Sequence, residues 1–254
     1  MFSLANKTAI PADDASPWRA DEFAPTMIDL PRGEFFMGEN AGDKFANGTE
    51  RPAHRVKFSK NFALGKFPVT VGEFRQFRPS HLSDDKNDLP VASVSWRDAI
   101  AYCDWLTEQT NRIYRLPSEA EWEFACRGGL QTPFSCGDEI TIADANFLYD
   151  ENGLRTGIGR RTPVGNYPPN KFGFHDFHGN VCEWIADNWH PNYFGAPCDG
   201  SVWIGNENNH RVIRGGAWDY LPRLLRSPWR DWRDEDFRAD NLGFRVATSG
   251  PKNF

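Results

Sequence analysis

Three segments of the chain carry hydrophobic residues at helical spacing, and each follows a hydroxyl residue with an acid three positions later. In that arrangement the hydroxyl side chain and the acid satisfy backbone amides at a helix start, here at Thr70, Ser95 and Ser118. The second helix is the clearest, because apolar residues recur every three or four positions over 96–106. The third helix is expected to end at Gly128, where a second glycine follows.

Short alternating or apolar runs predict strands at 27–31, 33–38, 55–58, 211–218 and 242–247. From residue 130 to residue 209 no helical period appears, and turn residues alternate with aromatic ones. A loop region this long inside a compact domain needs bound metal or dense aromatic packing to hold it. The pattern predicts one loop-rich α+β domain over residues 26–254, preceded by an N-terminal arm at residues 1–25.

Composition agrees with a folded, loop-rich domain. The chain has 254 residues, of which 39% are hydrophobic and 14% aromatic, with 10 Trp, 22 Gly and 18 Pro. A net charge of −6 argues against nucleic-acid binding, which rests on clustered Lys and Arg. Neither a membrane-spanning apolar run nor a signal peptide is recognisable, so we expect a cytoplasmic protein without membrane insertion; its oligomeric state is not set by the sequence.

Nine short motifs, in the same order as in a known family, give the chain a specific resemblance. They lie at 33–38, 68–70, 94–99, 115–123, 169–170, 173–181, 183–184, 214–216 and 242–245. Together they make the chain resemble the formylglycine-generating enzyme, or sulfatase-modifying factor, family over residues 26–248. The resemblance implies a C-type-lectin-like fold, an α+β domain with small antiparallel sheets and two main helices.

The family's catalytic cysteines have no counterpart in this chain. Family enzymes that oxidise a substrate cysteine bind Cu(I) through two cysteines after the Gly-Gly pair, since soft thiolates prefer Cu(I). Here no cysteine follows Cys198, and Ala217 replaces the usual serine. We therefore expect no copper and lean against an enzyme.

The five cysteines are an odd number, which favours thiols over a disulfide framework. The resemblance places the partner positions of Cys103 and Cys126 at Val246 and Ser227, which also favours reduced thiols. Cys182 replaces the family's usual aromatic residue. It is either a reactive thiol or a buried inert side chain, and the second interpretation is favoured because free cysteine is often buried.

Two sets of residues are candidates for metal binding. His175 and His178 lack further His or Cys ligands for zinc, so a structural role is favoured. The resemblance implies a structural Ca²⁺ site at Asp176, Gly179, Asn180, Val181 and Glu183. It implies a second Ca²⁺ site beginning at Asn146 and Phe147, whose later acid is replaced by Thr156, with Asp150 as the alternative acid.

The segment from Trp218 to Asp240 is rich in Trp, Tyr and Arg, which dominate binding hot spots. In retroelement-diversified relatives this stretch is the displayed variable surface. The alternative is that its tryptophans pack the core and its charges pair on a solvated face. The candidate ligand-binding residues are Trp218, Asp219, Tyr220, Leu221, Arg223, Leu224, Trp229, Asp231, Trp232, Asp234 and Phe237.

These observations predict a non-catalytic protein that binds a protein or small-molecule ligand at its C-terminal face, with diversification by a retroelement as an extension. The alternative is an oxidoreductase of the same family, acting on a thiol through a cysteine such as Cys182 or on a biosynthetic substrate. A third hypothesis is an accessory domain that docks on a partner through residues such as Trp229 and Trp232.

Overall fold

A computed structural model describes residues 23–39, 42–82, 84–110, 112–205 and 209–251. The predicted arm of residues 1–25 lies outside them except for 23–25. The described residues form helices α1 (Val71–Phe77), α2 (Trp96–Gln109) and α3 (Glu119–Arg127), with short 3-10 helices η1 (Gly48–Glu50) and η2 (Pro222–Leu224). All three predicted helix starts are confirmed, since each α-helix begins with a complete capping box.

The described strands are more numerous than the sequence predicts. They are β1 (Met27–Leu30), β2 (Glu34–Met37), β3 (His54–Lys57), β4 (Phe62–Gly65), β5 (Arg112–Arg115), β6 (Cys182–Asn188), β7 (His210–Arg214), β8 (Arg230–Asp234), β9 (Leu242–Gly243) and β10 (Ala247–Pro251). The strand predicted at 211–218 ends at Arg214, because Gly215 and Gly216 turn the backbone with positive φ of 91° and 68°. The strand predicted at 242–247 is two strands in different sheets.

The strands form three small sheets, in the orders β1-β4-β10-β5, β2-β3 and β8-β7-β6-β9. Every pairing of the described strands is antiparallel except that of β6 with β9, which is parallel. The C-terminal strand β10 lies between β4 and β5 and so holds the first sheet together. This is the expected α+β, loop-rich architecture, with α1 as a short third helix.

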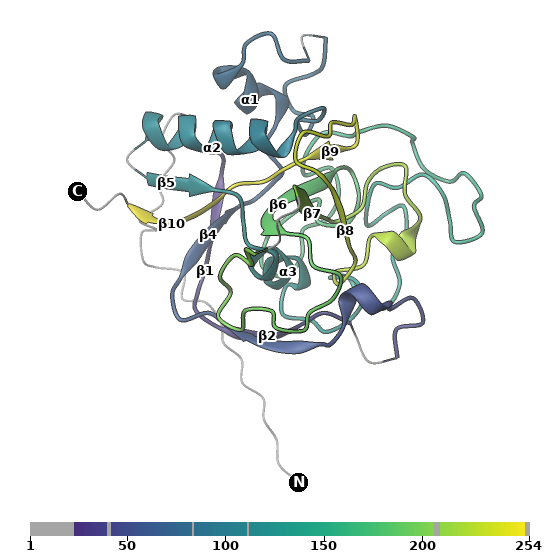
Figure 1. The fold of residues 1–254 in the computed structure, drawn as a ribbon. Helices are drawn as coiled ribbons and strands as arrows, with labels where there is room; N and C mark the ends of the chain where they lie inside the picture. Colours follow the sequence, from purple (N-terminus) through teal and green to yellow (C-terminus); the bar gives the residue numbers. More distant parts are fainter. Residues whose placement is uncertain (1–22, 40–41, 83, 111, 206–208, 252–254) are drawn as a thin grey trace.

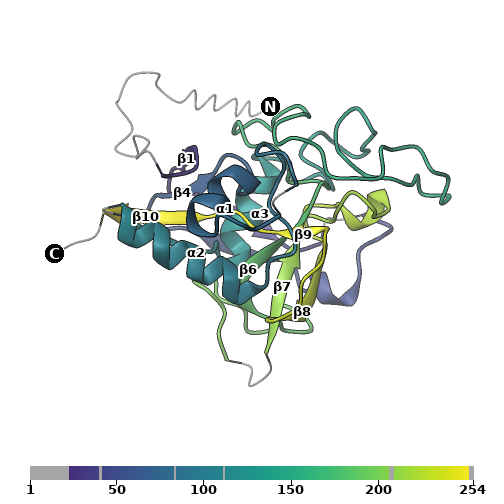
Figure 2. The same ribbon diagram turned by 90° about the horizontal axis from the view of Figure 1, so that it is seen from above.

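The helices and the long loops lie in different parts of the molecule. Figure 1 shows α2 along one side of the first sheet, next to β5, and α3 at the centre of the molecule. The loops between α3 and β6 lie to one side, as Figure 2 also shows. None of the helices in the described ranges is long and apolar enough to cross a bilayer.

Helix α3 carries charge into the centre of the protein. All nine of its residues are buried, including the carboxylates of Glu119 and Glu123. Arg214 pairs with both carboxylates, while Arg230 pairs with Glu119 and Arg127 with Glu123. Buried charges are tolerated only when they are paired and hydrogen-bonded, so this network fixes α3 against β7 and β8.

Aromatic packing holds the long loop region in place, one of the two means the sequence suggested. The ring of Phe177 packs edge-on to that of Trp122 on α3, with centroids 5.0 Å apart, and contacts Phe174 at 5.5 Å. The side-chain amide of Asn170 donates to the carbonyls of Ala125 and Cys126 at the end of α3. The loops therefore rest on α3.

Replacing Arg214 with methionine should lower the free energy of unfolding by about 3 to 5 kcal/mol, because Glu119 and Glu123 would lose a buried partner. Urea denaturation measures this change. Arg55→Met is the matched control, since Arg55 pairs with Glu34 at the surface and its loss should leave stability almost unchanged. Equal effects of the two substitutions would contradict the importance of the buried network.

Candidate functional site

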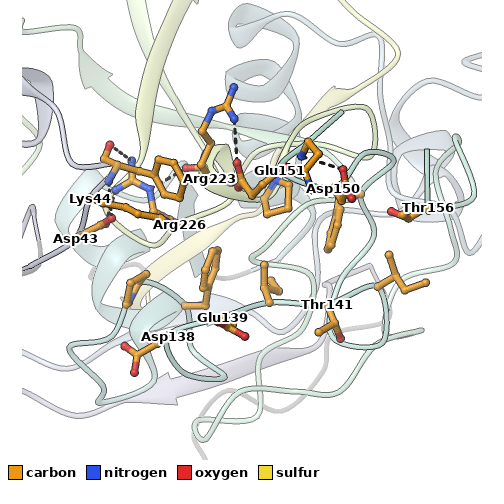
Figure 3. Close-up of a pocket in the computed structure, with 18 of the residues that line it drawn as sticks. Asp43, Lys44, Asp138, Glu139, Thr141, Asp150, Glu151, Thr156, Arg223 and Arg226 are labelled. Carbon is orange, nitrogen blue, oxygen red and sulfur yellow. Dashed lines mark hydrogen bonds and ion pairs between the residues drawn. The ribbon is translucent and has the colours of Figure 1, made fainter. Parts of the chain in front are cut away.

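A cavity of about 810 Å³ opens beside η2, and three separate stretches of chain build it. Its walls come from residues 42–45 near the start of the domain, from loops between 131 and 156, and from Pro222, Arg223 and Arg226 near its end. Figure 3 shows Arg223 and Arg226 on one wall and Asp138, Glu139 and Thr141 on the wall opposite. The cavity is the first candidate for a binding site.

Arg226 fixes the wall that comes from the start of the domain. Its guanidinium donates to Asp43 Oδ2 at 2.7 Å, to Glu50 Oε1 at 2.7 Å and to the carbonyl of Phe45 at 3.0 Å. The Arg226 side chain is only 2% exposed. Burial raises the pKa of the Glu50 carboxyl, although Arg226 acts in the opposite direction. Charge-assisted bonds of this kind hold residues 43–50 against η2.

Arg223 fixes the loop on the other side of η2. Its backbone N–H donates to Glu151 Oε1 at 2.5 Å, and its guanidinium donates to Glu151 Oε2 at 2.9 Å. This pair is partly exposed, so it contributes less stability than the Arg226 cluster. Two arginines of one short segment thus fasten two loops and shape the cavity between them.

The floor of the cavity is hydrophobic. Phe134 and Phe147 belong to a small apolar cluster with Leu225, separate from the two main cores, and Ile140 packs against it. Ile142 also lines the cavity and is 50% exposed at its edge. An apolar floor with a charged rim is the usual composition of a small-molecule site.

The predicted ligand-binding residues do not form one concave face. Arg223 lines the large cavity, whereas Tyr220 and Phe237 line a separate pocket of about 140 Å³ together with Cys182. The Asp219 carboxylate accepts two hydrogen bonds from Asn241. The segment is therefore divided between two hollows.

Other predicted ligand-binding residues support the scaffold. Trp229 is 6% exposed and belongs to a main core, as the alternative interpretation of the tryptophans holds. Trp232 stacks on His210 with ring centroids 3.7 Å apart, and Asp234 lies 3.3 Å from the same histidine. Asp231 pairs with Arg233. The remaining three are half-buried: Trp218, Leu221 and Leu224.

The residues of the first predicted calcium site offer few free ligands. Both oxygens of Glu183 accept hydrogen bonds from Arg245 at 2.6 Å, and one also accepts from Trp122 Nε1. Asp176 is buried and accepts the backbone N–H of Gly165. Gly179, Asn180 and Val181 are buried nearby. In the described ranges no three His, Cys, Asp or Glu side chains converge on a metal position, so a Ca²⁺ ion here would depend on backbone and amide oxygens as well.

At the second predicted calcium site, the side-chain amide of Asn146 forms hydrogen bonds within the protein. Asn146 Nδ2 donates to Asn180 Oδ1 at 3.1 Å and to the carbonyl of Arg160 at 3.0 Å. Phe147 is buried in the cavity floor, and Asp150 accepts backbone N–H groups of its own turn. These hydrogen bonds join Asn146 to two neighbouring loops, and calcium at this second site stays a prediction.

Removing calcium with a chelator should leave the midpoint of thermal unfolding unchanged, because Glu183, Asn146 and Asp150 already form hydrogen bonds within the protein. Differential scanning calorimetry with and without added CaCl₂ measures this. A lower midpoint that recovers on adding calcium back would show instead that the calcium prediction is right, since a ligand of the native state stabilises it.

All five cysteines are free, and three of them are buried. Cys126 Sγ lies 3.5 Å from Ser227 Oγ, at the partner position that the family resemblance indicated. Cys103 shares a core cluster with Val246, its other indicated neighbour. Burial raises the pKa of the Cys126 thiol to about 12 and raises those of Cys103 and Cys182 as well. Such thiols are poor nucleophiles.

His178 is a buried residue that links two loops through hydrogen bonds. Its Nδ1 is 2.7 Å from the carbonyl of Leu225, to which it donates, and its Nε2 accepts from the backbone N–H of Ser135 at 3.0 Å. This requires a neutral ring, and burial lowers the pKa of His178 to about 4. The histidine joins η2 to the cavity loop, which is the structural role that was favoured.

Stability should fall as the pH is lowered from 6.5 to 4, because His178 takes up a proton in the unfolded chain before it does so in the folded one. Above pH 6.5 both states are neutral and the contribution is fully present. The shift corresponds to about 3 kcal/mol. In His178→Gln, the free energy of unfolding measured by urea denaturation should change between pH 6.5 and 4 by about 3 kcal/mol less than in the original protein. The same pH dependence in both proteins would contradict the assignment.

The cavity residues could not be identified from the sequence, because most lie in loops without periodicity. One signal was available: Phe134, Ile140 and Ile142 are apolar residues set among Asp138, Glu139 and Thr141 in a segment with no helical or strand period. Asp43 and Glu50 gave no signal, since their partner Arg226 lies far away in the sequence.

Small sheets, a central helix and long ordered loops define a formylglycine-generating-enzyme-like domain with a C-type-lectin-like fold. The chain belongs to the family of the sulfatase-modifying factor enzyme 1-like domain, whose model matches residues 14–249. This confirms the resemblance drawn from the motifs.

Curated relatives include proteins described as inactive and as active enzymes. The chain is 30% identical to the inactive C-alpha-formylglycine-generating enzyme 2 of Mus musculus, over 89% of this chain and 86% of that protein. It is 28% identical to the formylglycine-generating enzyme of Streptomyces coelicolor, over 93% and 94%. Family membership alone therefore does not decide between binding and catalysis.

Solved structures share the fold. PvdO from Pseudomonas aeruginosa has a TM-score of 0.79 and 34% identity, covering 90% of this chain and 96% of PvdO. Treponema denticola variable protein 1 has a TM-score of 0.74 and 21% identity, covering 88% and 95%. The second likeness concerns the fold alone.

Proposed function

We propose that this chain is a non-catalytic binding protein and that the cavity beside η2 is its ligand site. The observation that carries the proposal is a hollow of about 810 Å³ whose walls are fastened by the Arg226 and Arg223 ion pairs. A site held open in the free protein costs little ordering on binding. Its volume is within the usual range for small-molecule sites.

The proposal changes where the ligand is expected. The predicted C-terminal face contributes Arg223, while the apolar contacts come from residues such as Phe134 and Phe147. The tryptophans of the C-terminal segment serve mainly the scaffold, since Trp229 is buried and Trp232 stacks on His210. A small molecule fits this partly open hollow of about 810 Å³ better than the surface of another protein would.

The chemistry of the cysteines supports binding over thiol oxidation. Cys182 is 1% exposed, and burial raises its pKa, so it is mostly protonated at neutral pH. No cysteine follows the Gly215-Gly216 pair. The mouse relative that is described as inactive is consistent with a family scaffold retained without that activity.

A bulky side chain at the cavity edge should block binding without unfolding the protein. For Ile142→Trp we expect at least a tenfold loss of affinity for naphthylmethanol, a neutral aromatic probe, measured by isothermal titration calorimetry. Ile113→Trp is the control, because Ile113 on β5 is equally exposed, at 49% against 50%, and does not line the cavity. Equal binding by both variants would place the probe elsewhere.

The oxidoreductase alternative has a direct test. Purified protein supplied with Cu(I), O₂ and a cysteine-containing peptide should form no aldehyde, measured by mass spectrometry after hydrazide capture. Aldehyde formation that requires Cys182 would replace the binding proposal with an oxidase.

The retroelement extension stays a prediction about the gene. A neighbouring reverse-transcriptase gene with a template copy of the coding sequence for the C-terminal segment would support it, and a locus without either would remove it.

A further inference from the structure

We infer that the cavity selects ligands in which an aromatic or other apolar body carries a positively charged group, such as an amine. This inference rests on the proposed binding function and adds the chemical class of the ligand. The reason is that the arginines of the walls are paired with acids of the protein, whereas three of the acids that line the cavity form no ion pair among the described residues.

The arginines of the cavity are already neutralised by the protein. Arg226 contacts two buried carboxylates, those of Asp43 and Glu50, and Arg223 contacts Glu151. An incoming carboxylate or phosphate would have to displace Asp43 or Glu50 from Arg226, or share Arg223 with Glu151 and meet the repulsion of that carboxylate. Displacing Asp43 or Glu50 would leave a buried charge without a partner, which is costly. The site therefore discriminates against anions.

The remaining charge of the lining is mainly negative. Five acidic and three basic side chains line the cavity. Asp138 and Glu139 form no ion pair in the part of the chain that the structure describes, and neither does Asp150, which accepts only backbone N–H groups. The one lining cation outside the described ion pairs is Lys44, whose ammonium lies 4.9 Å from the centroid of the Phe45 ring.

The hydrophobic floor supplies the other half of the selectivity. Phe134, Phe147 and Ile140 exclude water from one side of the hollow, so a ligand gains by burying an apolar body there. A positive group on that body would then lie near the acids at the rim of the cavity. Two net negative charges about 8 Å away, at a dielectric close to that of water, favour the cation over a neutral group about sixfold.

Three matched probes test the inference on the full chain: naphthylmethylamine, naphthylmethanol and naphthylacetate. Titration calorimetry should give the tightest binding for the amine, about sixfold weaker binding for the alcohol, and weaker binding again for the carboxylate. Added NaCl should reduce the preference for the amine and leave the alcohol unaffected, because salt screens only the charged ligand.

A double substitution, Asp138→Asn with Glu139→Gln, removes the two exposed acids and keeps their shapes. It should bring the affinity for the amine close to that for the alcohol and leave the affinity for the alcohol unchanged. The control is Asp104→Asn with Glu108→Gln on the exposed side of α2, which makes the same change in net charge away from the cavity. This control should keep the full preference for the amine.

The outcomes separate the two proposals. If none of the three probes binds in the cavity, the binding function falls and the selectivity falls with it. If the alcohol or the carboxylate binds at least as tightly as the amine, the cavity is a binding site and the inferred ligand class is wrong. Loss of the preference in the control variant as well as in the Asp138 and Glu139 variant would also overturn the inference.

Discussion

Carboxylates buried against guanidinium groups are the interaction on which the rest of this structure depends. Glu119 and Glu123 on α3 face Arg214 and Arg230, and Glu183 on β6 faces Arg245. The pairs of α3 join parts of the chain that no sheet connects, and the Glu183–Arg245 pair reinforces the pairing of β6 with β9. Since a buried charge without its partner is far less favourable than a paired one, a loop that supplies a partner has little freedom to leave.

This constraint explains how a domain with short strands holds long loops in fixed positions. The sheets have few strands and the loops few backbone ladders, so side-chain pairs and aromatic contacts with α3 carry much of the order. At the cavity the same device acts through Arg226 and Glu50. Ion pairs between carboxylates and guanidinium groups thus hold both the centre of the scaffold and the walls of the cavity.

The sequence predicted the features that depend on local rules. Capping boxes located all three helices, and the family resemblance placed Ser227 beside Cys126. Strand β6 was missed because Glu183 and Asp187 are buried within it, which breaks the expected alternation of apolar and polar residues. Buried acids in a strand are allowed only by partners distant in sequence, which no local pattern reveals.

The cavity was missed for the same physical reason. Its apolar residues lie in loops, and its walls depend on pairs such as Arg226 with Asp43. Conversely, Trp229 and Trp232 looked like ligand contacts because composition does not distinguish a tryptophan that packs inward from one that faces solvent.

The distance in sequence between the walls of the cavity has a consequence for synthesis of the protein. Asp43 emerges from the ribosome long before Arg226, and the central strand β10 emerges later still. A growing chain therefore cannot close the hollow, nor complete its first sheet, until almost the whole domain has been translated. A chain terminated before Arg226 would lack both the ion pairs that hold this wall of the cavity and the strand β10 that joins β4 to β5.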